Sequence, residues 1–509
     1  MVVHSSSRSQ IKLMTDLPIL SFAIWVPISV GLVVLVLGLI PGKFSNSTIK
    51  TVGFFASLIS LGSSVLPLLY FQSGFASMQL VERFFWIKSL GISYFLGVDG
   101  ISIFFIPLTG LVTFIVILSA WEVIGKKVSL YIGNFLVLSG LLNGVFSALD
   151  GILFYIFFEA TLIPMYFIIG IWGGPNRIYA SIKFFLYTLL GSLLALVALI
   201  YLYQISGSFS ILDWHNKGID LTTQYYIFAA FFMAFAVKIP MWPIHTWLPD
   251  AHVEAPTGGS IILAAIMLKL GGYGFLRISL PVLPEASQAL SMLIIVLSLI
   301  AISYIALVAL IQEDMKRLVA YSSIAHMGFV TLGIFLFSPL GVQGAIFQMI
   351  SHGFISGAMF FSIGVLYDRV HSRKISDYGG VCNTMPIFAG FFVFFAMANC
   401  GLPVTSGFVG EFFVILAAIK ENILVGSLAA LTLVLGAAYS LFLVKKVFYG
   451  EVANDKVANL VDVNGREKFL LLIFSFFILL FGIKPSLITD VTQASVDNLT
   501  NHVSRGKQP

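Results

Sequence analysis

Charged side chains are scarce in this chain. Only 10% of its 509 residues are Asp, Glu, Lys or Arg, whereas an ordinary soluble protein has roughly 25%. Hydrophobic residues make up 59% of the sequence, and Phe alone contributes 48 residues. A soluble core does not need so much apolar surface, so the composition predicts a protein whose solvent is lipid.

Cysteine is almost absent, and the two that occur, Cys382 and Cys400, form no CxxC pair. The sequence contains no ligand spacing typical of a metal or iron–sulfur site. It also has neither a dinucleotide-binding glycine motif nor a phosphate-binding loop. We therefore expect no metal and no cofactor in this chain. The net charge of +5 is spread over loops rather than gathered in one stripe, so we expect no nucleic-acid partner.

Long apolar segments dominate the rest of the chain. A helix that crosses a bilayer needs ~20 mostly apolar residues, and about fourteen segments meet this requirement. They are 19–40, 52–72, 100–120, 129–148, 150–170, 180–204, 224–242, 257–277, 288–310, 318–337, 342–366, 386–419, 425–447 and 468–488. The sequence thus predicts an all-α polytopic membrane protein. Residues 1–17 read as a short polar tail, and the alternating pattern in 73–99 predicts a small hairpin outside the membrane.

An even number of spans places both termini on one side of the membrane. Fifteen Lys and Arg residues then fall on the side without the termini, and ten fall on the terminal side. Because cytoplasmic loops carry an excess of Lys and Arg, both termini should face outward.

Two of the spans contain residues that break helices beside a charge. Span seven runs into Pro240 and Pro243 just after Lys238, and span twelve has Gly401 and Pro403 before Glu411. Each is the fourth member of a five-span unit, spans 4–8 and 9–13. Five crossings are an odd number, so the second unit is expected to be inverted, as in many ion-coupled transporters. The predicted organisation is residues 1–128 (helices 1–3 and the hairpin), 129–277 (first repeat), 288–449 (inverted repeat) and 450–509 (helix 14 and tail).

Five ionisable side chains lie inside predicted spans: Glu159, Lys183, Lys238, Lys269 and Glu411. A charge at the bilayer centre costs at least ~2.5–3.5 kcal/mol, so such residues usually face a bundle interior and often mark an ion path. Lys238 should lie at the C-terminal end of a half-helix, where Pro240 frees a carbonyl and the dipole favours a cation. Glu411 should lie in the first turns of the second half-helix of span twelve, which favour an anion. The alternative for both is a structural ion pair in a packed bundle.

Glu159 lies among phenylalanines, five residues before Pro164. A buried glutamate must be protonated or paired, and Lys238 is the expected partner. Such a pair is a proton switch if it opens, or a static ion pair if it does not. Lys269 on the next span would be the following relay stop. Lys183, near a helix start, either continues the path or snorkels to the interface.

Histidines supply further candidates. His326 and His352 lie in spans ten and eleven, where imidazoles either pass protons or are satisfied core residues. A stretch rich in Trp and Pro follows span seven and holds His245, Asp250, His252 and Glu254. We interpret this stretch as a candidate cytoplasmic proton inlet, with an ordinary loop favoured over a metal site.

The residues at the breaks also resemble a known family. The run from Lys238 to Pro256, KIPMWPIHTWLPDAHVEAP, resembles the hallmark of the antiporter-like membrane subunits of respiratory complex I and of multi-subunit cation/proton antiporters. Residues 401–412 are similar to the broken twelfth helix of the same superfamily. Residues 351–371 and the sequence DYGG from Asp377 resemble the M-type (chain-4-type) subunit, and Glu411 fits that type because its neighbours carry lysine there. The resemblance covers nearly the whole chain.

This resemblance implies a fourteen-helix subunit of the membrane arm of NADH:quinone oxidoreductase, embedded in a bacterial inner membrane or, alternatively, the mitochondrial inner membrane. Its neighbours would be the L-type and N-type subunits. Its proton channel would use Glu159 and Lys238 as the switch, Lys269 with His326 and His352 as the connection, and Glu411 as the outlet. NADH, FMN, iron–sulfur clusters and quinone would belong to partner subunits. The alternatives are a subunit of a sodium/proton antiporter complex and a structural spacer.

Overall fold

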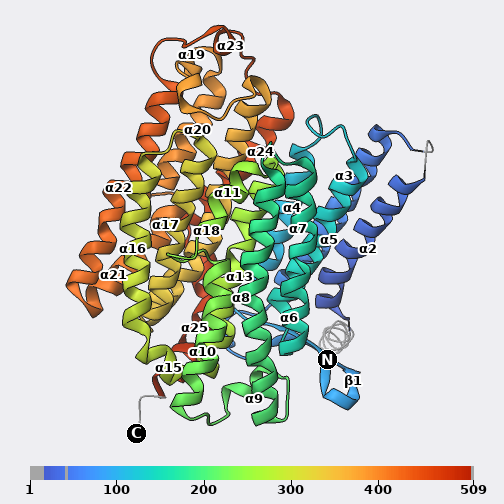
Figure 1. Ribbon diagram of the computed structural model, residues 1–509, viewed down its shortest axis with the longest axis vertical. Coiled ribbons are helices and arrows are strands. Elements are labelled where there is room, and N and C mark those ends of the chain that lie inside the picture. The colour runs from blue at the N-terminus through green and yellow to red at the C-terminus, as the bar shows by residue number, and fades with distance from the viewer. Residues whose placement is uncertain (1–16, 41–43, 506–509) are drawn as a thin grey trace, which may run out of the picture.

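Helices form at every predicted apolar segment of the chain (Figure 1). The structure, a computed structural model, describes residues 17–40 and 44–505. The first half contains α2 (Ile19–Leu39), α3 (Asn46–Tyr70), α4 (Phe105–Ser119), α5 (Val128–Ser147), α6 (Gly151–Ala160), α7 (Leu162–Trp172), α8 (Arg177–Ser206), α9 (Ile211–His215), α10 (Leu221–Lys238) and α11 (Trp247–Glu254). The predicted polar tail lies outside the described residues except for Leu17.

The second half continues the bundle. Its elements are α12 (Thr257–Ile262), α13 (Lys269–Gly274), α14 (Leu280–Val282), α15 (Pro284–Ala289), α16 (Ser291–Leu310), α17 (Met315–Phe335), α18 (Pro339–Val370), α19 (Val381–Thr384), α20 (Pro386–Asn399), α21 (Ser406–Glu421), α22 (Ile423–Phe448), α23 (Asp455–Ala458), α24 (Gly465–Ile483) and α25 (Ser486–Arg505).

Among the described residues, ten helices are long and apolar enough to cross a bilayer, or up to eleven if α24 and α25 count as one bent span. The helices α4 and α20 are apolar but shorter. The chain is therefore an all-α polytopic membrane protein, as predicted. The count of fourteen spans, the inverted repeat and the four-part division of the chain stay predictions.

The two predicted helix breaks are present, and span five is also interrupted, at Thr161 between α6 and α7. In span seven, α10 ends at Lys238, and turns through the two prolines lead to α11. Span twelve divides into α20 and α21, and Gly401 between them has a φ of +78°, a conformation that favours glycine. Each break leaves a charged residue close to a helix end.

One detail of the prediction for span seven was wrong. The carbonyl of Ala236 is not left free, because it accepts a hydrogen bond from the backbone N–H of Met241 at 2.8 Å. The indole N–H of Trp247 caps the next carbonyl, that of Val237, at 3.0 Å. Buried carbonyls need partners, so the turn after the helix folds back to supply them.

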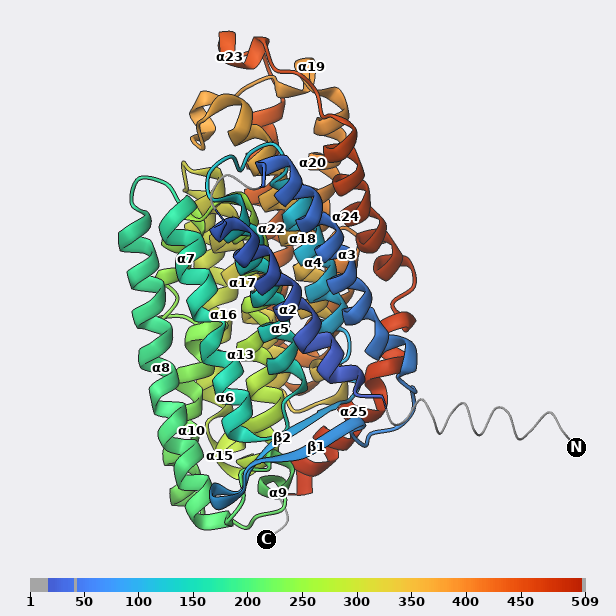
Figure 2. The same cartoon turned by 90° about the vertical axis from the view of Figure 1, so that its right-hand side faces the viewer.

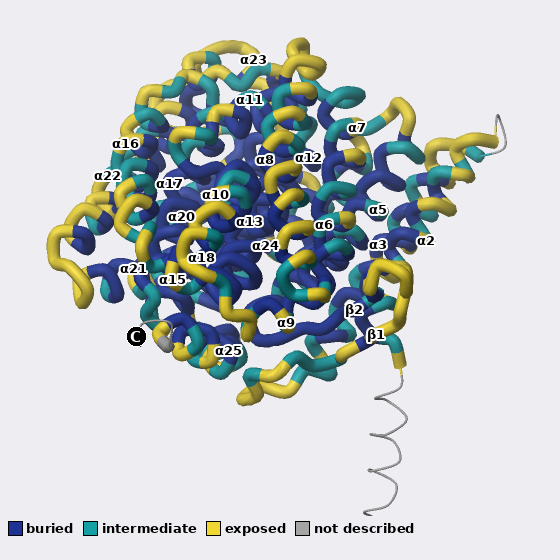
Figure 3. The backbone as a smooth tube through the Cα atoms, turned by 60° about the horizontal axis from the view of Figure 1, so that its bottom comes forward, coloured by how far each residue is buried: buried dark blue, intermediate teal, exposed yellow. Residues whose placement is uncertain are grey.

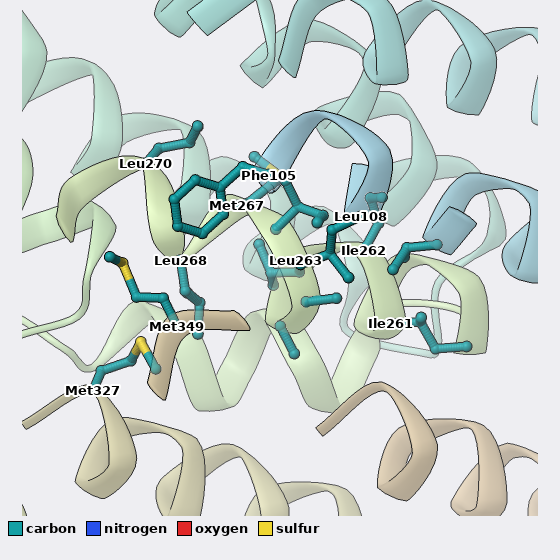
Figure 4. Close-up of a cluster of buried hydrophobic side chains, with 14 of the residues drawn as sticks. Phe105, Leu108, Ile261, Ile262, Leu263, Met267, Leu268, Leu270, Met327 and Met349 are labelled. Atoms are coloured by element: carbon teal, nitrogen blue, oxygen red, sulfur yellow. The ribbon is translucent and has the colours of Figure 1, made fainter. Parts of the chain in front are cut away.

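Span eight forms the centre of the bundle. Its eighteen-residue apolar window is fully buried, and Figure 3 shows this region and α18 in dark blue inside a rim with exposed segments. Two π-helical turns, Leu263–Met267 and Phe275–Ser279, interrupt it. Figure 4 shows how its apolar side chains pack against α4, α17 and α18. The labelled residues are Phe105, Leu108, Ile261, Ile262, Leu263, Met267, Leu268, Leu270, Met327 and Met349.

The outer helices have the opposite character. α2, α3, α8, α16 and α22 are less than half buried, and their exposed residues are largely apolar. Exposed apolar surface on membrane helices faces lipid rather than water. The lipid-facing rim and the buried centre together place any ionisable path within the bundle.

A β-hairpin and a surface helix cover one end of the bundle (Figure 2). Strands β1 (Gln79–Ile87) and β2 (Ile92–Val98) pair antiparallel, which confirms the hairpin predicted in residues 73–99. Helix α25 is bent by 63° from α24. This helix lies in the predicted C-terminal tail; its apolar residues occupy only one face and form no long hydrophobic run that would indicate a helix.

Candidate functional site

A line of buried titratable side chains runs through the middle of the bundle. The Lys269 Nζ lies 2.7 Å from His352 Nδ1, and His326 Nδ1 lies 2.6 Å from Glu411 Oε1. The two imidazole rings are 5.7 Å apart between centroids. We call these four residues the central polar chain. They come from α13, α18, α17 and α21, so the fold brings together residues from both predicted repeats.

The position of Lys269 depends on the irregular helix around it. Its ammonium donates to the carbonyl of Ala264 at 2.5 Å, and that carbonyl lies in the first π turn. π turns are frequent at functional sites. Helix α18 packs closely against this π turn because its residue 353 is glycine: a Cβ at that position would lie 3.0 Å from the carbonyl oxygen of Ala265. His352, the neighbour of Gly353, thereby reaches Lys269.

Glu411 lies in the second turn of α21, as predicted, and is 3% exposed. Side chains from neighbouring helices stabilise its carboxylate: His326, and Gln348, whose Nε2 donates at 3.1 Å. The Tyr439 hydroxyl lies 3.4 Å from the other ring nitrogen of His326. Sequence reasoning missed Gln348 and Tyr439, because a single polar residue on a long helix gives no signal of which partner it faces.

Glu159 and Lys238 are close enough to interact electrostatically, but the predicted direct ion pair is not formed. Neither Lys238 Nζ nor Glu159 Oε1 has a hydrogen-bond partner in the described part of the chain. The Lys238 ammonium instead lies 4.7 Å from the centroid of the Phe158 ring, a favourable cation–π contact. Phe158 precedes Glu159 in the last turn of α6, and its ring, not the carboxylate, lies against the end of the Lys238 side chain. The pair is therefore separated in this structure.

Helix α13 connects the two parts of the site. A Cβ at Gly271 would lie 2.8 Å from the backbone nitrogen of Ile239, the residue after Lys238. The helix that carries Lys269 thus packs directly on the end of α10. Backbone contact this close requires glycine at that position.

Lys183 belongs to a different cluster. Its Nζ donates to Asp250 Oδ2 at 2.7 Å, and Arg317 binds the other oxygen of the same carboxylate at 2.8 Å. The Lys183 side chain is 18% exposed. Its ion pair explains its charge without a relay role, so the alternative of an interfacial position is closer to what the structure shows.

The stretch after span seven is held by contacts rather than free in solution. Glu254 accepts from the backbone N–H of Asn176 at 2.9 Å, and Arg373 lies 3.9 Å from its other oxygen. The His252 ring is fully buried and stacks on Phe360, with centroids 4.3 Å apart. No group of three or more His, Cys, Asp or Glu in the described ranges is placed to hold a metal ion.

Two further buried basic residues lie at the edges of predicted spans: Arg277 ends the span 257–277, and Lys316 lies two residues before the span 318–337. Lys316 is 4% exposed and donates to the carbonyl of Ala255 at 2.7 Å. Arg277 and Asp99 form an ion pair at 2.5 Å, with each side chain 4% exposed. Both lie near the ends of predicted spans, where boundaries read from hydropathy are least certain and the partner is far away in the sequence.

Bent membrane helices around a buried line of lysine, histidine and glutamate define a class: polytopic membrane proteins with a charged path inside the bundle. Residues 148–436 match the family model described as NADH:quinone oxidoreductase/Mrp antiporter, transmembrane. The chain belongs to this family, which confirms the resemblance read from its motifs.

Individual relatives show which type of subunit within the family this chain is similar to. The chain is 48% identical over 497 residues to NADH-quinone oxidoreductase subunit M of Rhodobacter capsulatus, covering 95% of this chain and 96% of the relative. It is 45% identical over 455 residues to NADH-ubiquinone oxidoreductase chain 4 of Arabidopsis thaliana, covering 89% and 92%. Among solved structures it is similar to a chain of respiratory complex I from Thermus thermophilus with bound NADH. That match has a TM-score of 0.87, 29% identity, and coverage of 95% of this chain and 99% of the other.

Proposed function

We propose that this chain is the M-type membrane subunit of an NADH:quinone oxidoreductase and that it carries protons across the membrane. The observation that carries the proposal is the central polar chain, in which titratable groups from four helices follow one another across the buried core. The relatives named subunit M and chain 4 are subunits of NADH:quinone oxidoreductases, and this indicates to which enzyme the chain belongs. They favour it over a separate sodium/proton antiporter and over a structural spacer.

Each link of the central polar chain is suited to proton transfer. Lys269 and His352 share one hydrogen bond, as do His326 and Glu411. Between the two histidines no hydrogen bond is formed, and their rings are 5.7 Å apart. Rotation of an imidazole ring is the step that would carry a proton across this gap, because either ring nitrogen can hold it. The gap makes the path interruptible, which a pump requires.

Glu159 and Lys238 would control loading of the chain. With the pair separated, the Lys238 Nζ is buried and has no hydrogen-bond partner in the described part of the chain, and burial without a counter-charge disfavours an ammonium although the Phe158 ring offsets part of that cost. With the pair closed, the carboxylate would favour the ammonium. Opening the pair therefore favours proton transfer from Lys238 toward Lys269, whose helix packs against the end of α10. Glu411 would be the last group before release.

The surroundings of the subunit follow from the same proposal. The end of the bundle that holds the cluster of Lys183, Asp250 and Arg317, in α8, α11 and α17, would face the cytoplasm or the mitochondrial matrix, with His252 near the inlet. Both termini would face outward. L-type and N-type subunits would be the neighbours in the membrane arm. NADH, FMN, iron–sulfur clusters and quinone would be bound by partner subunits, whose electron transfer drives the change at Lys238.

Proton counting with the intact complex tests the proposal. The variant Lys269→Met removes the charge and keeps an unbranched apolar side chain of similar length. We expect it to assemble with the NADH-oxidising subunits and to translocate fewer protons per NADH in proteoliposomes. Lys420→Met, an exposed lysine at the end of α21, is the matched control and should keep the wild-type yield. A wild-type proton yield in Lys269→Met would refute the assignment.

A further inference from the structure

A cavity of about 520 Å³ lies on the flank of the bundle, apart from the central polar chain. Its walls come from α3, α4, α18, α24 and α25. Every lining side chain is apolar: Leu61, Val65, Leu68, Phe104, Pro107, Leu108, Leu111, Ile350, Phe354, Phe477, Phe481, Leu487 and Val491. A ligand with a buried polar group would find no hydrogen-bond partner among them, which costs free energy. The lining chemistry therefore selects a purely hydrocarbon occupant and excludes the ring of a quinone.

The cavity lies among helices that face lipid. Figure 2 shows α3, α4, α18 and α24 next to one another, with α25 across their end. Outside the cavity, α3 exposes Ile59 and Leu69, and α24 exposes Leu472 and Phe476. Its rims are thus continuous with the surface that the bilayer covers, and acyl chains are the hydrocarbon present there.

The size of the cavity excludes a neighbouring transmembrane helix. A helix with side chains is ~10–12 Å in diameter, and α4 at the floor of the cavity packs directly on α3, α18 and α24, which leaves only about 520 Å³ between them. A space that could admit a transmembrane helix would need lining helices farther apart than these. A single unbranched chain needs no such separation.

The end of the cavity at α25 is placed for a lipid headgroup. Leu487 and Val491, one turn apart, line this end, and their helix turns away from α24 at an angle of 63°. α25 lies across the end of the bundle and buries Ile488 and Val496 against it, so this end of the cavity lies where the spanning helices end and headgroups begin. Lys484, exposed at the bend, is three residues before Leu487, and a basic side chain at this level attracts a lipid phosphate.

We propose that this cavity, which we call the flank groove, holds one acyl chain of a phospholipid whose phosphate lies at Lys484. The chain would cover Leu108 at the floor of the flank groove. A Cβ at Gly353 would lie 3.2 Å from Leu108 Cδ2, and Gly353 follows His352. The bound lipid would therefore seal the side of the bundle nearest the central polar chain against water, a consequence that rests on the proposed function, whereas the lipid site itself does not.

Photolabelling of the intact complex tests the lipid site without reference to proton transport. The complex is reconstituted with a phospholipid that carries a diazirine in its acyl chain, irradiated, digested and mapped by mass spectrometry. We expect labelling of the α3, α4 and α24 peptides that line the flank groove to exceed labelling of α8, where Leu190 and Val197 are exposed on the surface of this chain. Equal or weaker labelling at the flank groove overturns the proposal.

A variant that fills the cavity gives the second arm. Val65→Trp places a bulky side chain in the flank groove, and Val197→Trp on α8 is the matched control on an open surface. We expect Val65→Trp to lose most of the labelling at the flank groove and Val197→Trp to keep it. Labelling that is unchanged by Val65→Trp in an assembled complex contradicts the assignment. The comparison within the wild-type protein stands even if a variant fails to assemble.

Discussion

The variants Glu411→Gln and Glu411→Ala distinguish two roles of Glu411: stabilising the fold through its hydrogen bonds, and taking up a proton. The carboxylate is 3% exposed and accepts from His326 and Gln348 at 2.6 and 3.1 Å. In Glu411→Ala both donors lose their partner, and at ~1–3 kcal/mol for each buried unsatisfied group the loss of stability is about 2–6 kcal/mol. Glu411→Gln keeps the size and a carbonyl oxygen, so it loses only the charge-assisted part of two bonds, about 1–2 kcal/mol. Neither side chain can take up a proton.

The assay combines the thermal midpoint of the purified complex with protons translocated per NADH in proteoliposomes. We expect both variants to lose proton translocation and only Glu411→Ala to lower the midpoint strongly. Glu421→Gln, an exposed change at the end of the same helix, should leave both quantities unchanged. Equal midpoints for the Ala and Gln variants would refute the hydrogen-bond reasoning, and a wild-type proton yield in Glu411→Gln would refute the role of Glu411 in transfer.

Three further variants test the structure around the site. Asp99→Asn leaves Arg277 buried without its counter-charge and should cost about 3–5 kcal/mol; a wild-type amount of assembled complex on native gels would contradict this. Lys183→Met removes one of the two basic partners of the partly exposed Asp250 carboxylate, and Arg317 remains. The stability should therefore fall by less than about 1 kcal/mol, and a large drop in the thermal midpoint would contradict this. Gly401→Ala forces a side chain into a left-handed conformation at φ +78°, at a cost of about 1–2 kcal/mol, and an unchanged midpoint would show that the turn relaxes.

The helices and their breaks could be predicted from sequence because the bilayer leaves few choices. Backbone groups in hydrocarbon must be paired within the segment, so a long apolar run is a helix. A proline or glycine at membrane depth then marks the place where that pairing fails. This reasoning places Lys238 at the end of α10 and Glu411 just after the start of α21, and the structure confirms both positions.

Contacts between helices could not be predicted in the same way. Hydropathy gives the ends of a span but not its rotation, so nothing in the sequence shows that Gln348 faces Glu411. Asp99 and Arg277 are 178 residues apart, and each alone reads as a charge at the edge of a span. Nothing in the sequence shows that the Lys238 ammonium lies over the ring of Phe158 rather than against the carboxylate of the next residue, Glu159. Amphipathic α25 gave no hydrophobic run and so escaped the search for spans.

Proton yield in a complex that carries Lys238→Ala is the most direct test of the claim that this chain conducts protons. Lys238 ends α10, is 2% exposed and makes no hydrogen bond through Nζ within the described residues, so its removal leaves no donor or acceptor without a partner. We predict that the variant assembles, that the complex still contains its NADH-oxidising subunits, and that protons translocated per NADH fall. A complex with the wild-type number of protons per NADH would contradict the account.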